Sequence, residues 1–294
     1  RLDRVLAVFF TLAGADSNPE RQRLQREFSP QLADFSSEIH ANAALFARIE
    51  RVWQARESLD LTAEQERLLY LTRRRFVRAG AALTGADERR MKEIMARLAE
   101  LGTAFTQNLL ADEAGWHMAL SEADLEGLPD FVVDAAREAG REKGLDAPVI
   151  TLSRSLIVPF LQFCPRRDLR ERAFRAWAAR GATDGETDNR EIAAEVLVLR
   201  EERAQLLGHE NFAAYKLETE MAGTPQTVRA LLMEVWHPAK AQAEADAQVL
   251  TEMMQEDGIN GPLEPWDWRY YAEKRRQAEH DLDEAALKPY LQLD

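Results

Sequence analysis

The stretch that decides the fold is residues 87–110, DERRMKEIMARLAELGTAFTQNLL. Its apolar residues recur mainly at steps of three or four, and they are Met91, Ile94, Met95, Leu98, Leu101, Phe105 and Leu109. This spacing places them on one face of a long amphipathic α-helix. Asp87 precedes the stripe and is expected to cap the helix. Gly102 interrupts the stripe at a cost of about 1 kcal/mol relative to alanine, which predicts the close approach of another helix.

The helical period continues on the N-terminal side of this stretch. The string Asp16-Ser17-Asn18-Pro19 offers cap oxygens and a proline for a first turn, and a long helix is expected from there to about Arg56. Thr62 and Gln65 have the spacing of a capping box, which predicts the start of the next helix.

Helices also dominate the C-terminal side. They are predicted over Asp168–Arg180, Asn189–Leu207 and Asn211–Met221, and from Thr224 onward. Pro225 suits the first turn of the last of these helices. Pro238 falls inside it and removes a hydrogen bond to Glu234, so it is expected to kink or divide the helix.

A different pattern fills the region between Gly115 and Cys164. Trp116, Met118 and Leu120 alternate with His117, Ala119 and Ser121. Together with the β-branched run at Val149–Leu152, this alternation predicts a short two-stranded element, with a helix over Pro129–Lys143 between the strands. Pro159 and Pro165 are expected to limit regular structure after it. The sequence therefore predicts an all-α fold of mainly long helices with a minor short β element.

Composition narrows the class of protein. The 294 residues are 46% hydrophobic, enough for a sizeable core, and carry a net charge of −13, which disfavours nucleic acid as a partner. Cys164 is the single cysteine, which excludes an internal disulfide and fits a reducing compartment, so a cytoplasmic location is expected. No run of 18 apolar residues occurs, so no membrane partner is expected. Arg1 already lies in an apolar helical pattern without an initiator methionine, which suggests a fragment.

Residues that could form a metal site do not combine into one. His209-Glu210 is half of a His-Glu-x-x-His motif, but position 213 is alanine, so a loop before a helix is expected. Glu234 and His237 have the spacing found in di-iron bundles, yet no second such pair exists, and an ordinary helix surface is expected. The histidines are scattered, at His40, His117, His209, His237 and His280.

Other reactive groups also lack partners in the sequence. Cys164 lies beside Pro165 in an apolar run, which predicts a buried, inert thiol. The carboxylates of Glu201 and Glu202 are adjacent in sequence and point to different helix faces, so they make a poor acid/base pair. The basic clusters Arg73-Arg74-Arg75 and Arg166-Arg167 are interpreted as solvated helix faces. We therefore expect no catalytic, cofactor-binding or metal-binding residue in this chain.

The aromatic group near the C-terminus consists of Trp266, Trp268, Tyr270 and Tyr271. The spacing favours Trp266, Tyr270 and Tyr271 as anchors of one helix face in a core, over a surface that stacks against a ligand. The surrounding segment Glu264–Asp294, EPWDWRYYAEKRRQAEHDLDEAALKPYLQLD, resembles the P-W-D-x-x-Y-Y-x-E-K signature and the D-L-D-E-x-x-L-K-P-Y stretch of the thimet oligopeptidase and neurolysin-like zinc metallopeptidases.

Further stretches resemble the same family and together cover nearly the whole chain. They are Ala44–Glu50, Val52–Ser58, Phe76–Ala81, Asp168–Arg180 and Leu206–Tyr215. Within the family, Trp268 in PWDW and the WQARESL stretch at residues 53–59 look most like bacterial peptidyl-dipeptidases, also called dipeptidyl carboxypeptidases. The order and spacing of these motifs make the set specific to the family.

The resemblance implies a full-length parent enzyme that binds one zinc through His-Glu-x-x-His and a later glutamate. It implies cleavage of short peptides in a deep channel between two helical halves, with release of C-terminal dipeptides. Residues 1–165 would be an N-terminal helical region with the small β element, and residues 166–294 the start of the peptidase-family helical domain. None of the family's zinc ligands matches a residue here, so the expected partners are short peptides in the parent and its missing C-terminal catalytic half.

The resemblance also fixes the expected role of the chain. It would be the neurolysin-like N-terminal half that walls the channel, inactive by itself and without zinc, and its contribution would be steric. One alternative is an oligopeptidase that cuts peptides internally. Another is a non-catalytic helical adaptor that lacks the catalytic half.

Overall fold

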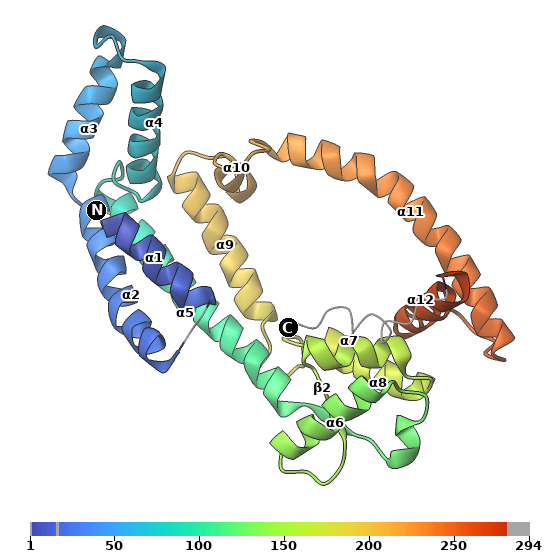
Figure 1. Ribbon diagram of the computed structural model, residues 1–294. Coiled ribbons are helices and arrows are strands. Elements are labelled where there is room, and N and C mark those ends of the chain that lie inside the picture. Colours follow the sequence, from blue (N-terminus) through green and yellow to red (C-terminus); the bar gives the residue numbers. More distant parts are fainter. Residues whose placement is uncertain (1, 16–17, 281–294) are drawn as a thin grey trace. The chain divides into compact units, whose positions relative to one another are not determined.

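The structure, a computed structural model, describes residues 2–15 and 18–280 (Figure 1). Its α-helices are α1 (Leu2–Ala15), α2 (Pro19–His40), α3 (Ala43–Ala55), α4 (Ala63–Arg78), α5 (Gly85–Gly115), α6 (Asp130–Glu142), α7 (Arg154–Phe163), α8 (Arg167–Ala178), α9 (Arg190–Leu206), α10 (Phe212–Leu217), α11 (Pro225–Glu256) and α12 (Pro265–His280). Two short 3-10 helices, η1 (Arg56–Ser58) and η2 (Glu122–Leu125), and two strands, β1 (His117–Ala119) and β2 (Val149–Thr151), complete the described elements. The expected all-α fold with a minor β element is confirmed.

The chain divides into two compact units. The first combines the residues up to Ala96 with Glu201–Phe212, and the second combines Arg97–Arg200 with the residues from Ala213 onward. The boundary expected between residues 165 and 166 falls inside the second unit and stays a prediction about the organisation of the parent protein.

In the first unit, α3 and α4 pack side by side as a hairpin (Figure 1). Thr62 and Gln65 form the expected capping box at the start of α4. Phe76 of α4 is buried, and its ring lies 5.0 Å from that of His40 and 6.0 Å from that of Phe46, measured between centroids. These rings join the end of α2 to the hairpin.

The core of the second unit surrounds the two strands, which pair antiparallel with Met118 opposite Ile150. Both side chains are fully buried, as the alternating pattern predicts. The buried cluster around them comprises Leu120, Leu125, Leu128, Val132, Ala136, Leu152, Leu156, Ile157, Phe160, Leu161, Cys164 and Ala173. It draws on β1, β2, α6, α7 and α8, so the β element is the centre of a helical core.

The expectation of one helix from Pro19 to Arg56 is wrong. Helix α2 ends at His40, and the side chain of Asn42 accepts a hydrogen bond from the backbone N–H of Leu45 at 2.9 Å, which starts α3. This cap satisfies a backbone donor that a continuous helix would satisfy internally, so the chain can turn here at little cost. The expected cap residues Asp16 and Ser17 lie outside the described residues.

Pro238 was expected to kink or divide its helix and Pro159 to limit regular structure, but neither proline divides the helix in which it lies. Pro238 lies inside α11, which runs without a break to Glu256, and Pro159 lies inside α7. A proline removes one helical hydrogen bond, which is a local cost. In α7 the neighbouring side chains of Ile157 and Phe160 are fully buried, and their packing stabilises the helical conformation.

Three smaller expectations also fail. Asp87 lies in the first turn of α5, which begins at Gly85. A Cβ placed at Gly102 would meet no described atom within 4 Å, so no helix approaches it closely. Helix α10 ends at Leu217, four residues before the expected Met221, because a turn follows it.

Candidate functional site

His209-Glu210, the partial His-Glu-x-x-His motif, lies just after the end of α9. The backbone N–H of His209 donates to the carbonyl of Ala204 at 2.9 Å, and Gly208 has a φ of +80°, which closes the end of α9. His209 and Glu210 therefore belong to the connection before α10, as expected for a loop.

The other histidines lie on separate elements. His40 ends α2, His117 begins β1, His237 is exposed on α11 and His280 ends α12. Glu234 is exposed on α11 near His237, as expected for a helix surface. Within residues 2–15 and 18–280, no group of three or more His, Cys, Asp or Glu side chains could hold a metal ion. This donor set does not fit the zinc site that the resemblance implies.

Cys164 lies in the core of the second unit and is fully buried. Burial raises the pKa of its thiol to about 11, because the low-dielectric surroundings disfavour the thiolate. The structure thus gives Cys164 the character of a structural thiol.

The basic clusters were expected to be solvated helix faces, and this is wrong for some of their members. Arg73 pairs with Glu50 across the hairpin at 2.8 Å with both side chains about a third exposed or less, whereas Arg75 is exposed. Arg167 reaches Asp267, whose side chain has no exposure. Acidic residues close to these arginines in the sequence suggested local ion pairs, so the pairs with distant carboxylates were not predicted.

A buried polar group in the second unit is centred on Arg170. Its Nη2 donates to Asp267 Oδ1 at 2.8 Å, and its Nε donates to the carbonyl of Trp266 at 3.1 Å. Nη1 donates to the carbonyls of Cys164 at 2.8 Å and Pro165 at 3.1 Å. The guanidinium therefore ties the turn between α7 and α8 to the first turn of α12.

Asp267 receives a second cation. Arg167 donates to it through Nη2 at 2.8 Å, and the backbone N–H of Glu264 donates to Oδ2 at 3.1 Å. Burial opposes ionisation of this carboxyl, but the hydrogen bonds from Arg167, Arg170 and the Glu264 backbone outweigh it and hold the pKa of Asp267 below its ordinary value. Neither Arg170 nor Asp267 was singled out from the sequence.

The aromatic residues next to this group divide between core and surface. Trp266 and Tyr271 are buried, and the Arg170 guanidinium lies 4.2 Å from the centroid of the Tyr270 ring. Trp268 is 37% exposed. The expected core role is thus confirmed for Trp266 and Tyr271.

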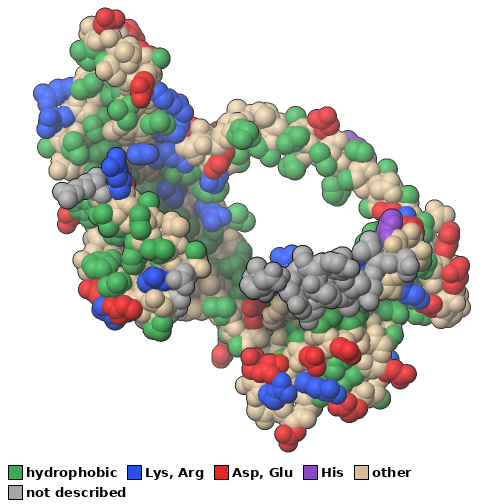
Figure 2. Space-filling view, in the orientation of Figure 1, with side chains coloured by type: hydrophobic (Ala, Val, Ile, Leu, Met, Phe, Trp, Pro, Cys, Tyr) green, Lys and Arg blue, Asp and Glu red, His purple; other side chains and the backbone are tan. Residues whose placement is uncertain are grey.

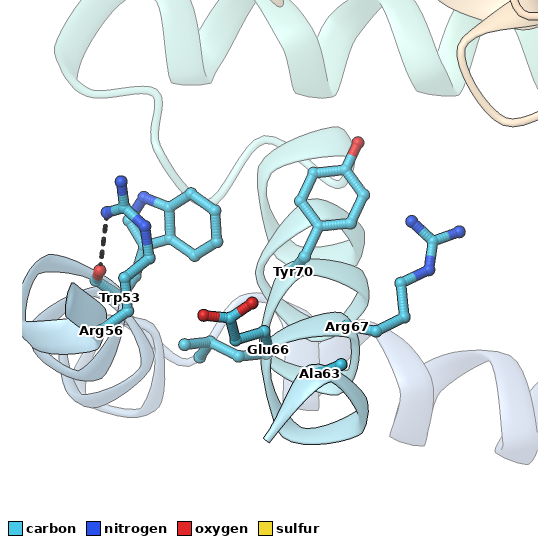
Figure 3. A pocket seen from close by; sticks show the side chains of 7 residues that line it. Trp53, Arg56, Ala63, Glu66, Arg67 and Tyr70 are labelled. Atoms are coloured by element: carbon cyan, nitrogen blue, oxygen red, sulfur yellow. Dashed lines mark hydrogen bonds between the residues drawn. The ribbon is translucent and has the colours of Figure 1, made fainter. Parts of the chain in front are cut away.

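An open hollow of about 500 Å³ lies on the hairpin of the first unit (Figure 3). It is lined by Trp53, Arg56, Ala63, Glu66, Arg67, Leu69 and Tyr70. Four of these residues follow the spacing 63, 66, 67 and 70, which places them along one side of α4. Trp53 and Arg56 come from the end of α3 and the start of η1, so the hollow depends on the hairpin being closed.

Two guanidinium groups stack on rings in this hollow. Arg56 lies 4.4 Å from the centroid of the Trp53 ring, and Arg67 lies 5.3 Å from that of Tyr70. Among the described residues Arg67 has this ring contact but no hydrogen bond or ion pair, so its donors face solvent. Glu66 points to the side of Trp53 and Arg56 (Figure 3).

The hairpin is also more basic than the chain around it. Residues 43–80 contain eight arginines and five acidic residues, a difference of +3, in a chain of net charge −13. Lys and Arg side chains gather on this part of the molecule (Figure 2).

Comparison with known proteins shows what the chain is similar to. The model of "Peptidase family M3" matches residues 160–294. "Dipeptidyl carboxypeptidase" of Escherichia coli (strain K12) is 37% identical over 100% of this chain and 43% of its own length, and that of Salmonella typhimurium is 38% identical with the same coverage. "Oligopeptidase A" of Escherichia coli (strain K12) is 30% identical over 98% of this chain and 43% of its own length.

The chain thus spans less than half the length of the relatives it matches. None of the helices that the structure describes is long and apolar enough to cross a membrane. The family match covers the α12 segment whose PWDW residues the Arg170 group holds in place. Residues 160–294 are thus similar to peptidase family M3, and the chain as a whole is similar to dipeptidyl carboxypeptidases and to oligopeptidase A.

Proposed function

We propose that this chain is the non-catalytic, channel-walling part of a zinc peptidase that removes C-terminal dipeptides from short peptides. The observation that carries the proposal is the identity of 37% and 38% to two dipeptidyl carboxypeptidases along the whole chain, against 30% to oligopeptidase A. The zinc ligands would lie in the part of the parent protein outside this chain.

The role of the chain in such an enzyme would be steric. Its long helices would form walls that admit short, unfolded peptides and keep water away from the reacting bond. The partial coverage of the relatives, 43% of their length, supports this division of labour. Every bond-breaking step would then depend on the remaining part of the parent.

Two measurements test this division. Elemental analysis of the purified chain is expected to find no stoichiometric zinc, and peptide digests followed by mass spectrometry are expected to find no cleavage. The parent protein, purified in the same way, is expected to hold one zinc and to release dipeptides. One tightly held zinc in the isolated chain would contradict the proposal.

A second candidate is an oligopeptidase that cuts peptides internally, favoured by the 30% identity to oligopeptidase A over 98% of the chain. The two activities separate on matched peptides with free or amidated C-termini. A dipeptidyl carboxypeptidase is expected to need the free carboxylate, so it should leave the amidated peptide intact. Internal fragments from both peptides would favour the oligopeptidase.

The adaptor alternative and the location have separate tests. An adaptor gene would reach its stop codon without encoding His-Glu-x-x-His, so the gene sequence downstream of Asp294 decides.

A cytoplasmic location is supported by the single buried thiol of Cys164, which needs no oxidising compartment. Cell fractionation is expected to recover the protein with cytoplasmic markers, and recovery in another compartment would contradict it.

A further inference from the structure

The first half of α11 has no covering partner among the described residues. From Arg229 to Ala245, every residue except Met233 is exposed. The buried residues of α11 are Leu250 and Met254, near its other end, where they pack with Tyr271 of α12. Since most helical stability in proteins comes from packing of an apolar face, so long an uncovered stretch implies a missing contact.

The uncovered stretch carries a large apolar surface. Leu231 is 62% exposed, Leu232 61%, Val235 58% and Trp236 57%. Green apolar side chains line the part of the molecule that Figure 1 labels α11 (Figure 2). Contiguous apolar surface of this kind marks an interaction site in a soluble protein.

This surface continues the face of α11 that is already buried. Leu232, Trp236, Ala239, Ala243, Leu250 and Met254 follow one another at steps of three, four or seven. Such steps place them along one face of the helix. The face that buries Leu250 and Met254 against α12 therefore extends, without a charged residue among these six, into the exposed half.

The end of α12 lies where that coverage stops. Arg275 donates to Asp246 at 2.9 Å, and Glu279 and His280 line a hollow of about 210 Å³ together with Asp246 and Leu250. The described chain thus leaves α12 beside the point at which α11 becomes exposed.

We propose that the apolar face of α11, formed by Leu231, Leu232, Val235, Trp236, Ala239 and Ala243, docks the part of the parent protein that lies outside this chain. This rests on the proposed function, which requires such a part, and on the 43% coverage of the relatives. The occupant would present an apolar surface, because the six residues that form the face are apolar. The alternative occupants are a second copy of this chain and the first unit of the same chain.

Hydrogen–deuterium exchange of residues 229–245 tests the proposal. These amides are expected to exchange at least tenfold more slowly in the parent protein than in the 294-residue chain. Equal exchange in both would overturn the proposal. Protection in the chain alone that grows with its concentration would assign the face to a second copy and would also overturn it.

A matched pair of variants gives a second readout. Ala243 lies on the apolar face and Ala241 on the opposite side of the helix, and both are exposed in this chain. Ala243→Asp is expected to lower the melting temperature of the parent and to release the protection of residues 229–245, whereas Ala241→Asp should leave both unchanged. In the isolated chain neither variant should have an effect. Equal behaviour of the two variants in the parent would contradict the proposal.

The outcomes separate this inference from the proposed function. A parent protein with protected residues 229–245 but without zinc or dipeptide release would leave the docking face standing and remove the peptidase function. A parent that releases dipeptides while these residues exchange freely would support the peptidase function and overturn the docking face.

Discussion

Arg170 and Asp267 form an ion pair with a distance of 2.8 Å between Nη2 and Oδ1, and neither side chain is exposed to solvent. The two residues lie 97 positions apart in the sequence. Because Arg170 also holds the carbonyls of Cys164 and Trp266, the pair fixes the start of α12 against the turn before α8. The PWDW segment that carries much of the family resemblance is thus placed by a buried charge.

Removal of the carboxylate from this pair is expected to destabilise the second unit. Asp267→Ala leaves two arginines facing a buried site, and the loss of one partner of a buried pair costs about 3–5 kcal/mol. Urea unfolding followed by circular dichroism measures the change. The control is Glu171→Ala, which breaks the exposed pair with Arg175 and should cost less than about 1 kcal/mol. Equal costs for both variants would show that the buried pair has no special role.

The same pair predicts how stability depends on pH. The folded-state pKa of Asp267 lies below its ordinary value of 3.8, so the unfolded state takes up the proton first as the pH falls. Its stabilisation is therefore fully present above about pH 4 and is lost as the pH falls through the folded-state pKa. The difference in unfolding free energy between the wild type and Asp267→Asn should be constant above pH 4 and shrink below it. A difference that stays constant down to pH 2 would contradict this assignment.

Two glycines of the second unit are expected to respond in opposite ways to the same substitution. A methyl group at Gly140 would overlap the carbonyl oxygen of Ala147, whereas one at Gly102 would meet no described atom. Gly140→Ala should therefore cost about 1–3 kcal/mol through overpacking. Gly102→Ala should stabilise α5 by up to about 1 kcal/mol. Thermal unfolding of the two variants in parallel checks both signs, and a stabilised Gly140→Ala would be inconsistent with the structure.

Local signals explain which parts of the fold could be predicted. The capping box of Thr62 and Gln65 and the cap at Thr224 each depend on residues that are close together in the sequence. Both predicted helix starts are confirmed. The end of α2 and the start of α3 at Asn42 were not predicted, because the apolar period continues across this position. Asn42 itself, as a cap residue inside the pattern, was the only sequence signal for the helix boundary. The close helix approach predicted at Gly102 was wrong, because a glycine in a helix does not by itself indicate that another helix lies against it.

The candidate sites were harder to predict, because they join residues that are distant in sequence. The hollow brings Trp53 and Tyr70 together, with their ring centroids 6.3 Å apart, only when the hairpin closes. In the sequence, Arg170 has the pattern of a surface arginine on an amphipathic helix. No neighbouring residue indicates that Asp267 is its partner. Periodicity can identify a buried face, but it carries no information on which distant charge will meet it.

The thiol of Cys164 offers a last test, because it reports on the core that the Arg170 group closes. Its pKa of about 11, against an ordinary value of 9.0, means that the thiolate fraction at pH 8 is smaller by about a hundredfold. Full burial slows any reagent further. Alkylation by iodoacetamide at pH 8 is therefore expected to be at least about a hundredfold slower in the native chain than in urea, with one thiol modified after unfolding. Asp267→Ala should speed the native reaction by loosening α12, while Glu171→Ala should not. A native rate equal to that in urea would contradict the burial of Cys164, and equal rates in the two variants would mean that the Arg170 group does not control access to it.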